Sequence, residues 1–393
     1  MTSADRNALL RRVGVVSLLV GVVGAVVTGL GYDGGSKAFL GAYLVAFLFW
    51  LGISLGSMIV CMLHGVTGGG WGLAVRRIAE AGYATLPLMA LSFVPVAMNV
   101  RTLYEWAGPS QVAADENLQK KAHWLNVEGY ETRAAIYFAL WIVTALLLNV
   151  FSPNEDADSE SPRNLWMQRV SGAGLILYGF SMTLAAVDWV MSLEPHWFSS
   201  MYGVIYWGGQ ALAGMSFCVL VMSLLESYPP FNRTVHTSRR HDLGNLLLAM
   251  VMFWSYASFM QYLIIWSGNL PEENVWYLNR SVGGYELVVL VLMGFHFAVP
   301  FALLLSRDIK QRQRRLMWVV AWLLAMRLVD WYWLAMPGVF PKRLTVPWQL
   351  PAALAAIGGF WLAIFAWRLA ARADLPIYDP ELTEGADERT AHS

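Results

Sequence analysis

The sequence predicts an all-α integral membrane protein with about ten transmembrane helices, arranged as two tandem four-helix bundles flanked by one helix at each end. Three observations lead to this fold class. The chain is 57% hydrophobic and only 14% charged, whereas about a quarter of the residues of a soluble domain are charged. Apolar runs long enough to cross a bilayer recur along the chain. Several short motifs also occur twice in the same order, which indicates a duplicated unit.

Ten apolar runs reach the length of about 20 residues that a helix needs to cross roughly 30 Å of hydrocarbon. They cover residues 13–31, 38–63, 79–100, 134–152, 168–193, 199–225, 243–266, 284–305, 315–336 and 347–370. We expect each run to form one membrane-spanning helix.

The two ends of the chain have distinct compositions. The first run follows Arg11 and Arg12, as in a signal peptide, but no small-residue cleavage site precedes Tyr32, so we expect an uncleaved signal anchor. The tail, residues 373–393, is polar, acidic and without periodicity. We expect it to be disordered.

Basic residues are distributed unequally between the two sides of the predicted membrane. The side that carries both termini holds 18 Lys and Arg residues, and the opposite side holds eight. Because cytoplasmic loops carry an excess of basic residues, we expect both termini to lie in the cytoplasm.

Four short motifs recur at the same places in the predicted topology. The matched segments are 106–108 with 266–268, 129–131 with 284–286, 145–148 with 302–305, and 187–189 with 329–331. Because they are collinear and each unit holds an even number of helices, they predict two parallel repeats. The expected divisions are a first span within 1–37, four-helix bundles at 38–197 and 198–340, a last span within 341–372, and the tail.

The last of these motifs places an aspartate inside each repeat. An ionised side chain within a membrane costs about 2.5–3.5 kcal/mol, so it usually faces the bundle interior and pairs with another group. Arg327 lies three residues before Asp330 and on the same helical face, which predicts an ion pair. Asp188 has Ala185 at the equivalent position. We therefore expect Asp188 to be the better candidate for a titrating group or a quinol hydrogen-bond acceptor, the alternative being that both acids only cap or bridge helices.

A histidine lies near the middle of the eighth predicted span. His296 is about 18 Å along the helix axis from the start of that span, and a histidine at this depth can relay protons. Glu286 precedes it on the same helix, and the two could border one cavity at different depths. The alternative for His296 is a structural hydrogen bond to a carbonyl of a neighbouring helix. No second histidine lies at matching depth, so we do not expect bis-histidine haem in this chain.

Uncharged polar residues occur in the sixth and seventh spans. Ser255, Ser258 and Tyr262 have the spacing of one helical face, where they could line a water wire or only hydrogen-bond neighbouring helices. Gln210 in the sixth span is a similar candidate.

Glu80 lies one turn before Tyr83, near the predicted cytoplasmic start of the third span. This position would suit the inner mouth of a proton path, and a structural role at the membrane interface is the alternative. Tryptophans concentrate at span ends, where we expect most of them to anchor the helices at the interface. They include Trp106, Trp189, Trp197, Trp266, Trp276 and Trp331.

Some functions are not expected of this chain. Its two cysteines, Cys61 and Cys218, both fall inside spans, so the sequence offers neither a disulphide framework nor a zinc or iron–sulphur ligand set. The formal net charge is zero, which gives no support for nucleic-acid binding.

Three segments have a specific resemblance. DWVMSLEPHWFSSMYG (188–203), FWSYASFMQYLIIWSGNLPEENVWY (253–277) and GFHFAVPFALLLSRDIK (294–310) resemble the ActF membrane subunits of alternative complex III, a bacterial quinol:electron-acceptor oxidoreductase. These subunits belong to the wider NrfD and polysulphide reductase membrane-subunit family, whose members carry two four-helix bundles. The resemblance extends from the second span to the ninth.

The resemblance implies a partner set and a location. It implies an ActC-like paralogue, an iron–sulphur subunit, c-type haem subunits and small membrane anchors in the bacterial inner (cytoplasmic) membrane. The complex would oxidise quinol and pass electrons to cytochrome c or an oxidase, with the c-type haem and iron–sulphur clusters held by partners. In the family the quinol site is usually assigned to ActC, whereas ActF has been discussed as a proton route.

Two other functional classes remain open from the sequence. A secondary transporter also combines parallel repeats with buried charges, although Pro95 and Pro300 interrupt spans that do not correspond in the two repeats. A non-catalytic membrane scaffold would use all of these polar residues for structure alone.

Overall fold

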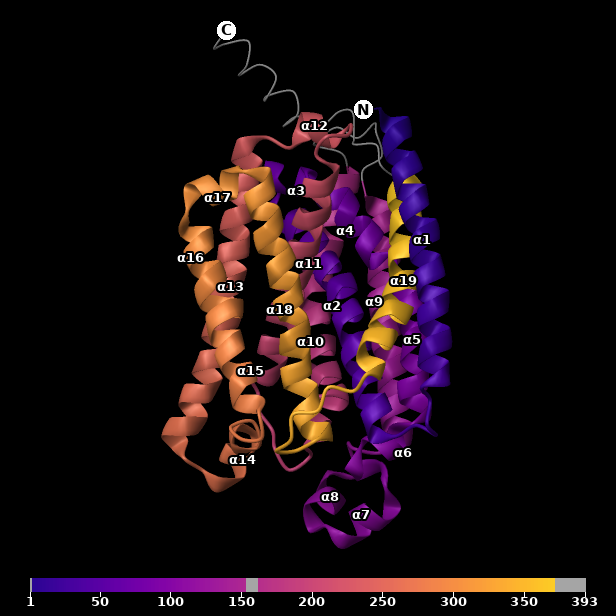
Figure 1. Ribbon diagram of the computed structural model, residues 1–393, viewed down its shortest axis with the longest axis vertical. Coiled ribbons are helices and arrows are strands. Elements are labelled where there is room, and N and C mark those ends of the chain that lie inside the picture. The colour runs from indigo at the N-terminus through magenta and orange to yellow at the C-terminus, as the bar shows by residue number, and fades with distance from the viewer. Residues whose placement is uncertain (1, 153–161, 372–393) are drawn as a thin grey trace.

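The computed structural model describes residues 2–152 and 162–371 (Figure 1). Within these residues the secondary structure is helical, and ten helical spans are long and apolar enough to cross a membrane. Each of them coincides with one of the ten predicted runs, so the all-α membrane fold is confirmed. The disorder expected for residues 373–393 concerns positions outside the described residues.

The first six spans run from the start of the chain to its centre. Their helices are α1 (Ser3–Leu30), α2 (Lys37–Thr67), α4 (Arg76–Tyr83) with α5 (Leu86–Met98), α9 (Val127–Phe151), α10 (Pro162–Trp189) and α11 (Tyr202–Leu225). The short elements between them are α3 (Gly70–Leu73), α6 (Val100–Leu103), η1 (Glu105–Ala107), α7 (Pro109–Ala114), α8 (Glu116–Lys121) and η2 (Met191–Leu193).

The remaining four spans run from the centre of the chain to residue 371. Their helices are α13 (Thr237–Gly268), α15 (Tyr285–Val291) continued through η3 (Leu292–Ala298) into α16 (Val299–Leu305), α18 (Gln313–Val339) and α19 (Gln349–Ala371). The connecting elements are α12 (Phe231–Thr234), α14 (Pro271–Asn279) and α17 (Arg307–Gln311).

The local sequence fixes where the helices around the site begin and end. Asn126 caps α9 by accepting a hydrogen bond from the Gly129 N–H at 2.7 Å, which satisfies one of the unpaired donors of the first turn. Asn269 ends α13 with a φ of 47°, a left-handed conformation that asparagine tolerates and that terminates a helix. The polar loops therefore start directly at the ends of the apolar runs.

The bundle has two different ends (Figure 1). The start of α1, the end of α19, α3, α12 and α17 lie together at one end, which we call the arginine-rich end because the loops there carry most of the basic residues. The segment from α6 to α8 and the helix α14 lie at the opposite end.

Helices α2 and α11 form the centre of the fold. They contact each other, and α10 and α18 each pack against both of them. A Cβ atom added at Gly56 would lie 2.0 Å from the Gln210 carbonyl oxygen, and one added at Gly214 would lie 2.1 Å from the Gly56 carbonyl carbon. Glycine is therefore required at both positions for backbone contact, as in other closely packed membrane helices. Since α2 and α11 are the first helices of the two predicted repeats, the two units share one central interface.

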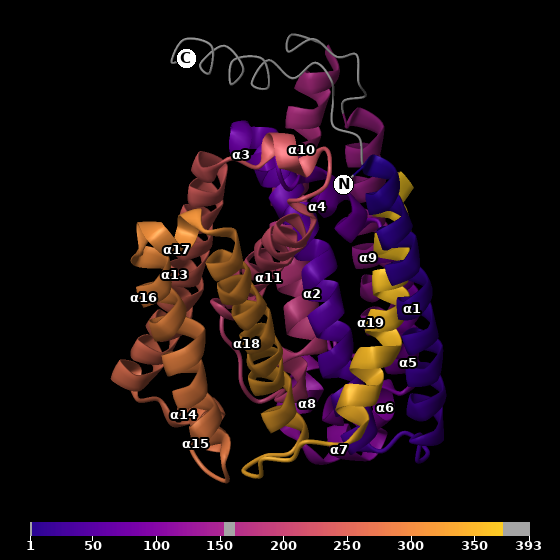
Figure 2. The same ribbon diagram turned by 45° about the horizontal axis from the view of Figure 1, so that its top comes forward.

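The first and last spans pack together on one side of this core (Figure 2). A Cβ atom at Gly359 would lie 2.2 Å from the Gly21 nitrogen, and one at Gly24 would lie 2.5 Å from the Ala356 nitrogen. Small residues thus allow α1 and α19 to meet along their length. The first predicted run is a packed helix of the fold.

The interruptions of the spans differ from the prediction in one place. Pro95 lies inside the continuous helix α5, and the break in the third span occurs at Ala84 and Thr85, before α5 begins. The Thr85 hydroxyl donates to the Gly82 carbonyl at 2.6 Å and so satisfies backbone at this break. In the eighth span, Pro300 follows the π-helical segment η3, whose wider turn accommodates a residue without an N–H donor.

Most tryptophans that we expected at the membrane interface lie in the protein interior instead. Of the six named above, only Trp266 is exposed, at 63%, whereas the other five are at most 4% exposed. Trp189 illustrates the reason, because its ring packs among Phe93, Phe138 and Trp141 with centroid distances of 4.7 to 5.8 Å. These large rings fill the space between helices that small residues would leave empty.

We predict that Gly214→Ala destabilises the protein by about 1–3 kcal/mol, because the added methyl group forces α2 and α11 apart. Thermal unfolding of the detergent-solubilised chain measures this effect. Gly179→Ala on α10 is the matched control, since a Cβ atom there meets nothing within 4 Å. Equal melting temperatures for the two variants would contradict the role assigned to the glycine contact.

Candidate functional site

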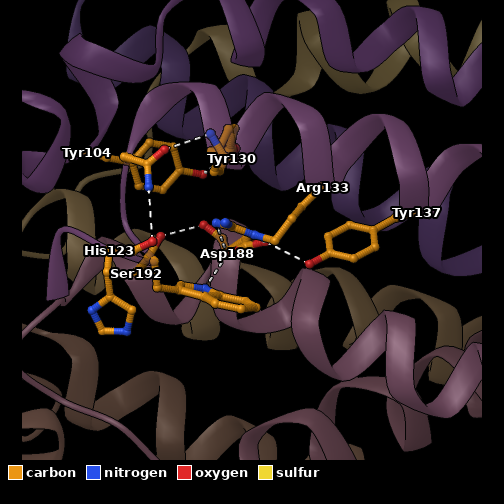
Figure 3. Close-up of polar contacts among 10 residues, drawn as sticks. Tyr104, His123, Tyr130, Arg133, Tyr137, Asp188 and Ser192 are labelled. Carbon is orange, nitrogen blue, oxygen red and sulfur yellow. Dashed lines mark hydrogen bonds and ion pairs between the residues drawn. The ribbon is translucent and has the colours of Figure 1, made fainter.

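Asp188 lies in a closed network of donors at the end of α10 (Figure 3). Its carboxylate accepts hydrogen bonds from Arg133 Nε and Nη2 at 2.8 and 2.9 Å, from Tyr137 OH at 2.9 Å and from Trp124 Nε1 at 3.0 Å. Arg133 and Tyr137 are one turn apart on α9 and therefore reach the carboxylate from the same helical face. Because a carboxylate has about four lone-pair sites, these donors use the hydrogen-bonding capacity of Asp188.

The prediction that Asp188 is the unpaired acid is wrong. Its side chain is fully buried and forms a two-point ion pair with Arg133, whose side chain is 16% exposed. The guanidinium group also lies 4.2 Å from the centre of the Trp124 ring. The prediction failed because it considered only partners within the helix of Asp188, whereas Arg133 lies on the preceding span.

Two tyrosines form a separate pair of hydrogen bonds beside this network (Figure 3). Tyr104 OH donates to the Trp189 carbonyl at 2.8 Å, and Tyr130 OH donates to Tyr104 OH at 3.2 Å. The duplicated segments 129–131 and 284–286 each contain a Tyr-Glu pair. Their tyrosines, Tyr130 and Tyr285, are fully buried, but Glu131 and Glu286 are exposed.

The ion pair predicted in the second repeat is confirmed. Arg327 Nη1 donates to Asp330 Oδ2 within α18, and both side chains are at most 3% exposed. A Cβ atom at Gly209 would lie 2.2 Å from the Arg327 guanidinium, so this glycine makes room for it on α11. Arg327 Nε and Nη2 are buried and have no hydrogen-bond partner among the described residues.

The two predicted repeats supply the arginine from different helices. By the spacing of the duplicated motifs, Val288 is the counterpart of Arg133, and Ala185 is the counterpart of Arg327. Each repeat therefore keeps its buried aspartate and one arginine, although the arginine lies on the third helix in the first repeat and on the fourth helix in the second. Comparison of GYETR with GYELV would have revealed the partner of Asp188 from the sequence.

His296 lies in η3, close to the Arg327–Asp330 pair. Its side chain is fully buried, its ring centre is 4.0 Å from that of Trp254 on α13, and Arg327 is near enough to act on it electrostatically. Neither ring nitrogen of His296 has a hydrogen-bond partner among the described residues. The alternative of a structural hydrogen bond to a neighbouring carbonyl therefore has no support from its contacts.

Glu286 does not share a cavity with His296, contrary to the prediction. It is exposed, and its carboxylate accepts a hydrogen bond from the Gly284 N–H at 2.9 Å. A carboxylate in the first turn of α15 stabilises the start of that helix. This local role explains why it turns away from the bundle interior.

The polar stripe predicted on α13 does not coincide with its buried face. Ser255 and Ser258 are only partly buried and Tyr262 is 42% exposed, whereas the buried positions are Trp254, Ala257, Gln261 and Ile265. Gln261 is the polar residue that α13 turns inward, and its side-chain oxygen accepts a hydrogen bond from Ser199 Oγ at 3.0 Å. The spacing of Ser255, Ser258 and Tyr262 places them on one helical face, but spacing alone does not show which face is buried.

Gln210 lies in the core, as expected for a polar candidate of the sixth span. Its side-chain oxygen accepts a hydrogen bond from Tyr178 OH, and its Nε2 has no partner among the described residues. The Tyr206 hydroxyl, one turn earlier on α11, is also buried and unpartnered within the described chain. Both groups therefore have hydrogen-bonding capacity in the interior.

Glu80 lies in a paired cluster near the arginine-rich end. Its carboxylate accepts hydrogen bonds from Arg76 at 3.2 Å, Arg77 at 2.7 Å and Ser152 at 2.6 Å, and its side chain is 2% exposed. Tyr83 lies one turn further along α4 and donates to Asn149 Oδ1 at 3.3 Å.

The sequence analysis did not identify one further buried arginine. Arg280, after α14, forms an ion pair with Glu194 at 2.7 Å, donates to the Trp276 and Leu334 carbonyls, and lies 3.6 Å from the Trp276 ring centre. It ties the loop after α10 to the second repeat. No pattern in the sequence indicates its burial.

Within residues 2–152 and 162–371, no three His, Cys, Asp or Glu side chains are grouped as a metal site requires. Comparison with models of known protein families gave no match. Comparison with curated proteins gave no match either.

We predict that Arg133→Met destabilises the protein by about 3–5 kcal/mol, because it leaves the Asp188 carboxylate buried without a counter-charge. Adding Asp188→Leu to this variant is expected to recover part of the loss. Thermal unfolding of the two single variants and the double variant measures the coupling.

Lys120→Met serves as the control for this cycle. Its ion pair with Glu116 is exposed, with side-chain exposures of 67% and 80%, and such pairs contribute little. Strictly additive effects of Arg133→Met and Asp188→Leu would contradict the coupling assigned to the buried pair.

Proposed function

We propose that the chain is an integral membrane subunit of a quinol-oxidising respiratory complex of the alternative complex III type, and that it contributes to proton translocation. The motifs at 188–203, 253–277 and 294–310 support the resemblance to ActF subunits. Quinol oxidation releases protons together with electrons. In this proposal the partner subunits carry the electrons on iron–sulphur clusters and c-type haems, and this chain carries protons. In this proposal the arginine-rich end faces the bacterial cytoplasm, and the excess of basic residues supports this orientation.

The proposal rests on one observation, which is that His296 is fully buried and that neither of its ring nitrogens has a partner among the described residues. A fully buried imidazole has two nitrogens that can each donate or accept a proton, and neither nitrogen of His296 is engaged by another described residue. Most buried polar groups in proteins are hydrogen-bonded, so a structural histidine would show a partner. The π-helical turn that holds His296 supports this reading, because such turns are frequent at functional sites.

The residues around His296 suit proton transfer at mid-membrane depth. Arg327 and Asp330 form a charge-balanced pair beside the imidazole, and the unpartnered nitrogens of Arg327 can donate to water. The hydroxyl of Tyr206 and the amide nitrogen of Gln210 extend the available donors along α11. Water molecules bound by these groups would connect His296 to its neighbours.

The Glu80 cluster and the Asp188 network lie toward the two ends of this interior region. Glu80 is held by Arg76 and Arg77 and would define the cytoplasmic mouth of the path. Asp188 is held by four donors, so its role in the proposal is to fix α9 against α10, and His296 carries the transfer. A quinol site on this chain would require a further contact beyond those that Asp188 already makes.

The first experiment is purification of the tagged chain from gently solubilised native membranes. We expect iron–sulphur and c-type haem subunits, an ActC-like paralogue and small membrane anchors in stoichiometric amounts, measured by subunit masses and the visible haem spectrum. A chain that is isolated alone and colourless would contradict the proposal and favour a secondary transporter.

We predict that His296→Ala, in the assembled complex, lowers proton release driven by quinol oxidation by about 10²-fold, the scale of a lost general acid–base group. Proton release from reconstituted vesicles and quinol oxidation are measured together, with subunit content as the assembly check. His241→Ala is the matched control, since His241 lies near the start of α13 at the arginine-rich end. Unchanged proton release and turnover in assembled His296→Ala would favour a scaffold.

A further inference from the structure

A basic surface lies at the arginine-rich end, where α17 leads into α18 (Figure 1). The segment 307–315 reads RDIKQRQRR and contains five basic residues and one acid. All four of its arginines have exposed side chains, namely Arg307, Arg312, Arg314 and Arg315. We call these four residues the α17–α18 arginine cluster, and it lies outside the interior region described above.

Other side chains of the segment hold it against the bundle. Lys310 is buried and donates to the Asn245 side-chain oxygen on α13 at 2.6 Å. Gln313 Nε2 donates to the Ser223 carbonyl oxygen on α11 at 2.6 Å. These contacts fix the backbone at the end of α17 and at the start of α18. The arginines are therefore presented on an ordered surface, which lowers the entropy cost of binding a ligand there.

The cluster contains more positive than negative charge. Asp308 is the acid of the segment, and its carboxylate accepts hydrogen bonds from Arg312 Nε at 2.6 Å and from Arg315. Arg307 and Arg314 are exposed, and neither forms a hydrogen bond or ion pair with any described residue. Their guanidinium groups retain all five N–H donors. Arginine in this state binds phosphate through two parallel hydrogen bonds.

The exposed face of α18 leads from these charges to an apolar surface. Trp318 lies four residues after Arg314 and three after Arg315, so all three share one helical face. It is 70% exposed and lies about 6 Å further along the helix axis than Arg314. Trp322, one turn later, is 41% exposed, and its indole N–H donates to the Phe295 carbonyl at 2.7 Å. Cations, then tryptophan, then apolar surface is the order that a helix shows where it leaves a membrane.

This order favours a phospholipid as the source of the phosphate. A phospholipid would place its phosphate at the arginines and the start of its acyl chains beside Trp318, whereas a soluble anion would use the arginines alone. Clusters of four or more basic residues directly beside a transmembrane helix attract anionic lipids.

We propose that the α17–α18 arginine cluster binds the head-group phosphates of anionic phospholipids, with Arg307 and Arg314 as the main contacts and Trp318 beside the acyl chains. Arg312 and Arg315 remain engaged with Asp308 and add to the attraction at longer range. The inference does not rest on the proposed function, since neither the Glu80 cluster nor His296 takes part in it.

The test measures lipid binding to the full chain after delipidation in detergent. Phosphatidylglycerol and phosphatidylcholine are added separately, and the bound lipids are counted by native mass spectrometry. We expect phosphatidylglycerol to bind more tightly, because its head group carries a net negative charge, and we expect that inorganic phosphate at the same concentration does not displace it. Equal binding of the two lipids, or displacement by inorganic phosphate, would overturn the proposal.

Substitutions locate the binding to the cluster. We predict that the double variant Arg307→Gln, Arg314→Gln binds phosphatidylglycerol about 30-fold more weakly, the combined scale for two basic residues at an anionic surface. The variant Arg307→Lys, Arg314→Lys keeps both charges and is expected to retain most of the binding. Both variants should keep the melting temperature of the unmodified chain when no lipid is added, because neither arginine pairs with a described residue. Unchanged lipid binding in the glutamine variant would overturn the assignment.

The double variant Arg11→Gln, Arg12→Gln is the matched control. It removes two exposed arginines from the same end of the bundle, and α1 has no tryptophan beside them. We expect it to have little effect, and a loss equal to that of the cluster variant would show that lipid binding follows only the total charge of this end. Phosphatidylglycerol binding that appears only after removal of residues 373–393 would show that this acidic segment occupies the cluster, and would contradict the proposal.

Discussion

The backbone contact between α2 and α11 is the constraint on which the rest of the structure depends. Gly56 and Gly214 allow the two helices to meet without an intervening side chain, and hydrogen-bonded helices in a membrane gain stability through such close packing. Because α2 and α11 are so close, α10 and α18 can each pack against both of them. The polar residues of the two repeats therefore face one common interior, and Gly209 on α11 leaves the space that the Arg327 guanidinium occupies.

Charge pairing is the second requirement that this interior imposes. Removing an ionised side chain from water costs several kcal/mol, and a partner of opposite charge recovers part of that cost only when the hydrogen-bond geometry is good. The buried carboxylates meet this requirement through arginine in each case, with Asp188 bound to Arg133, Asp330 to Arg327, and Glu80 to Arg76 and Arg77. Arginine suits this task because its planar donors match two carboxylate oxygens at once. Each of these buried carboxylates therefore needs a cationic partner, but this need does not determine which helix supplies it.

The sequence predicted those features that depend on one helix at a time. The ten spans follow from the length of apolar runs, and the Arg327–Asp330 pair follows from their spacing within α18. Features that depend on the rotation of a helix or on a neighbouring helix were not predicted. The stripe at Ser255 and Ser258 lies beside the buried face of α13, because an apolar helix in lipid carries no polar outer face that would mark its orientation. The partner of Asp188 lies on α9, and only alignment of the two repeats would have indicated it.

The two predicted repeats differ in the hydrogen-bonding capacity of their buried polar groups. In the first predicted repeat, Asp188 is surrounded by donors from Arg133, Tyr137 and Trp124, so its carboxylate has little capacity for another partner. In the second repeat, the arginine lies on the same helix as its aspartate, and the third helix is relieved of that role. On that helix the corresponding position, Val288, is apolar. Further along the same span, the π-helical segment η3 brings His296 into the interior, where neither ring nitrogen has a partner among the described residues. Because the fourth helix supplies the arginine, the third helix of the second repeat needs no ion-pairing residue, and this is why we propose His296 as the group that transfers protons.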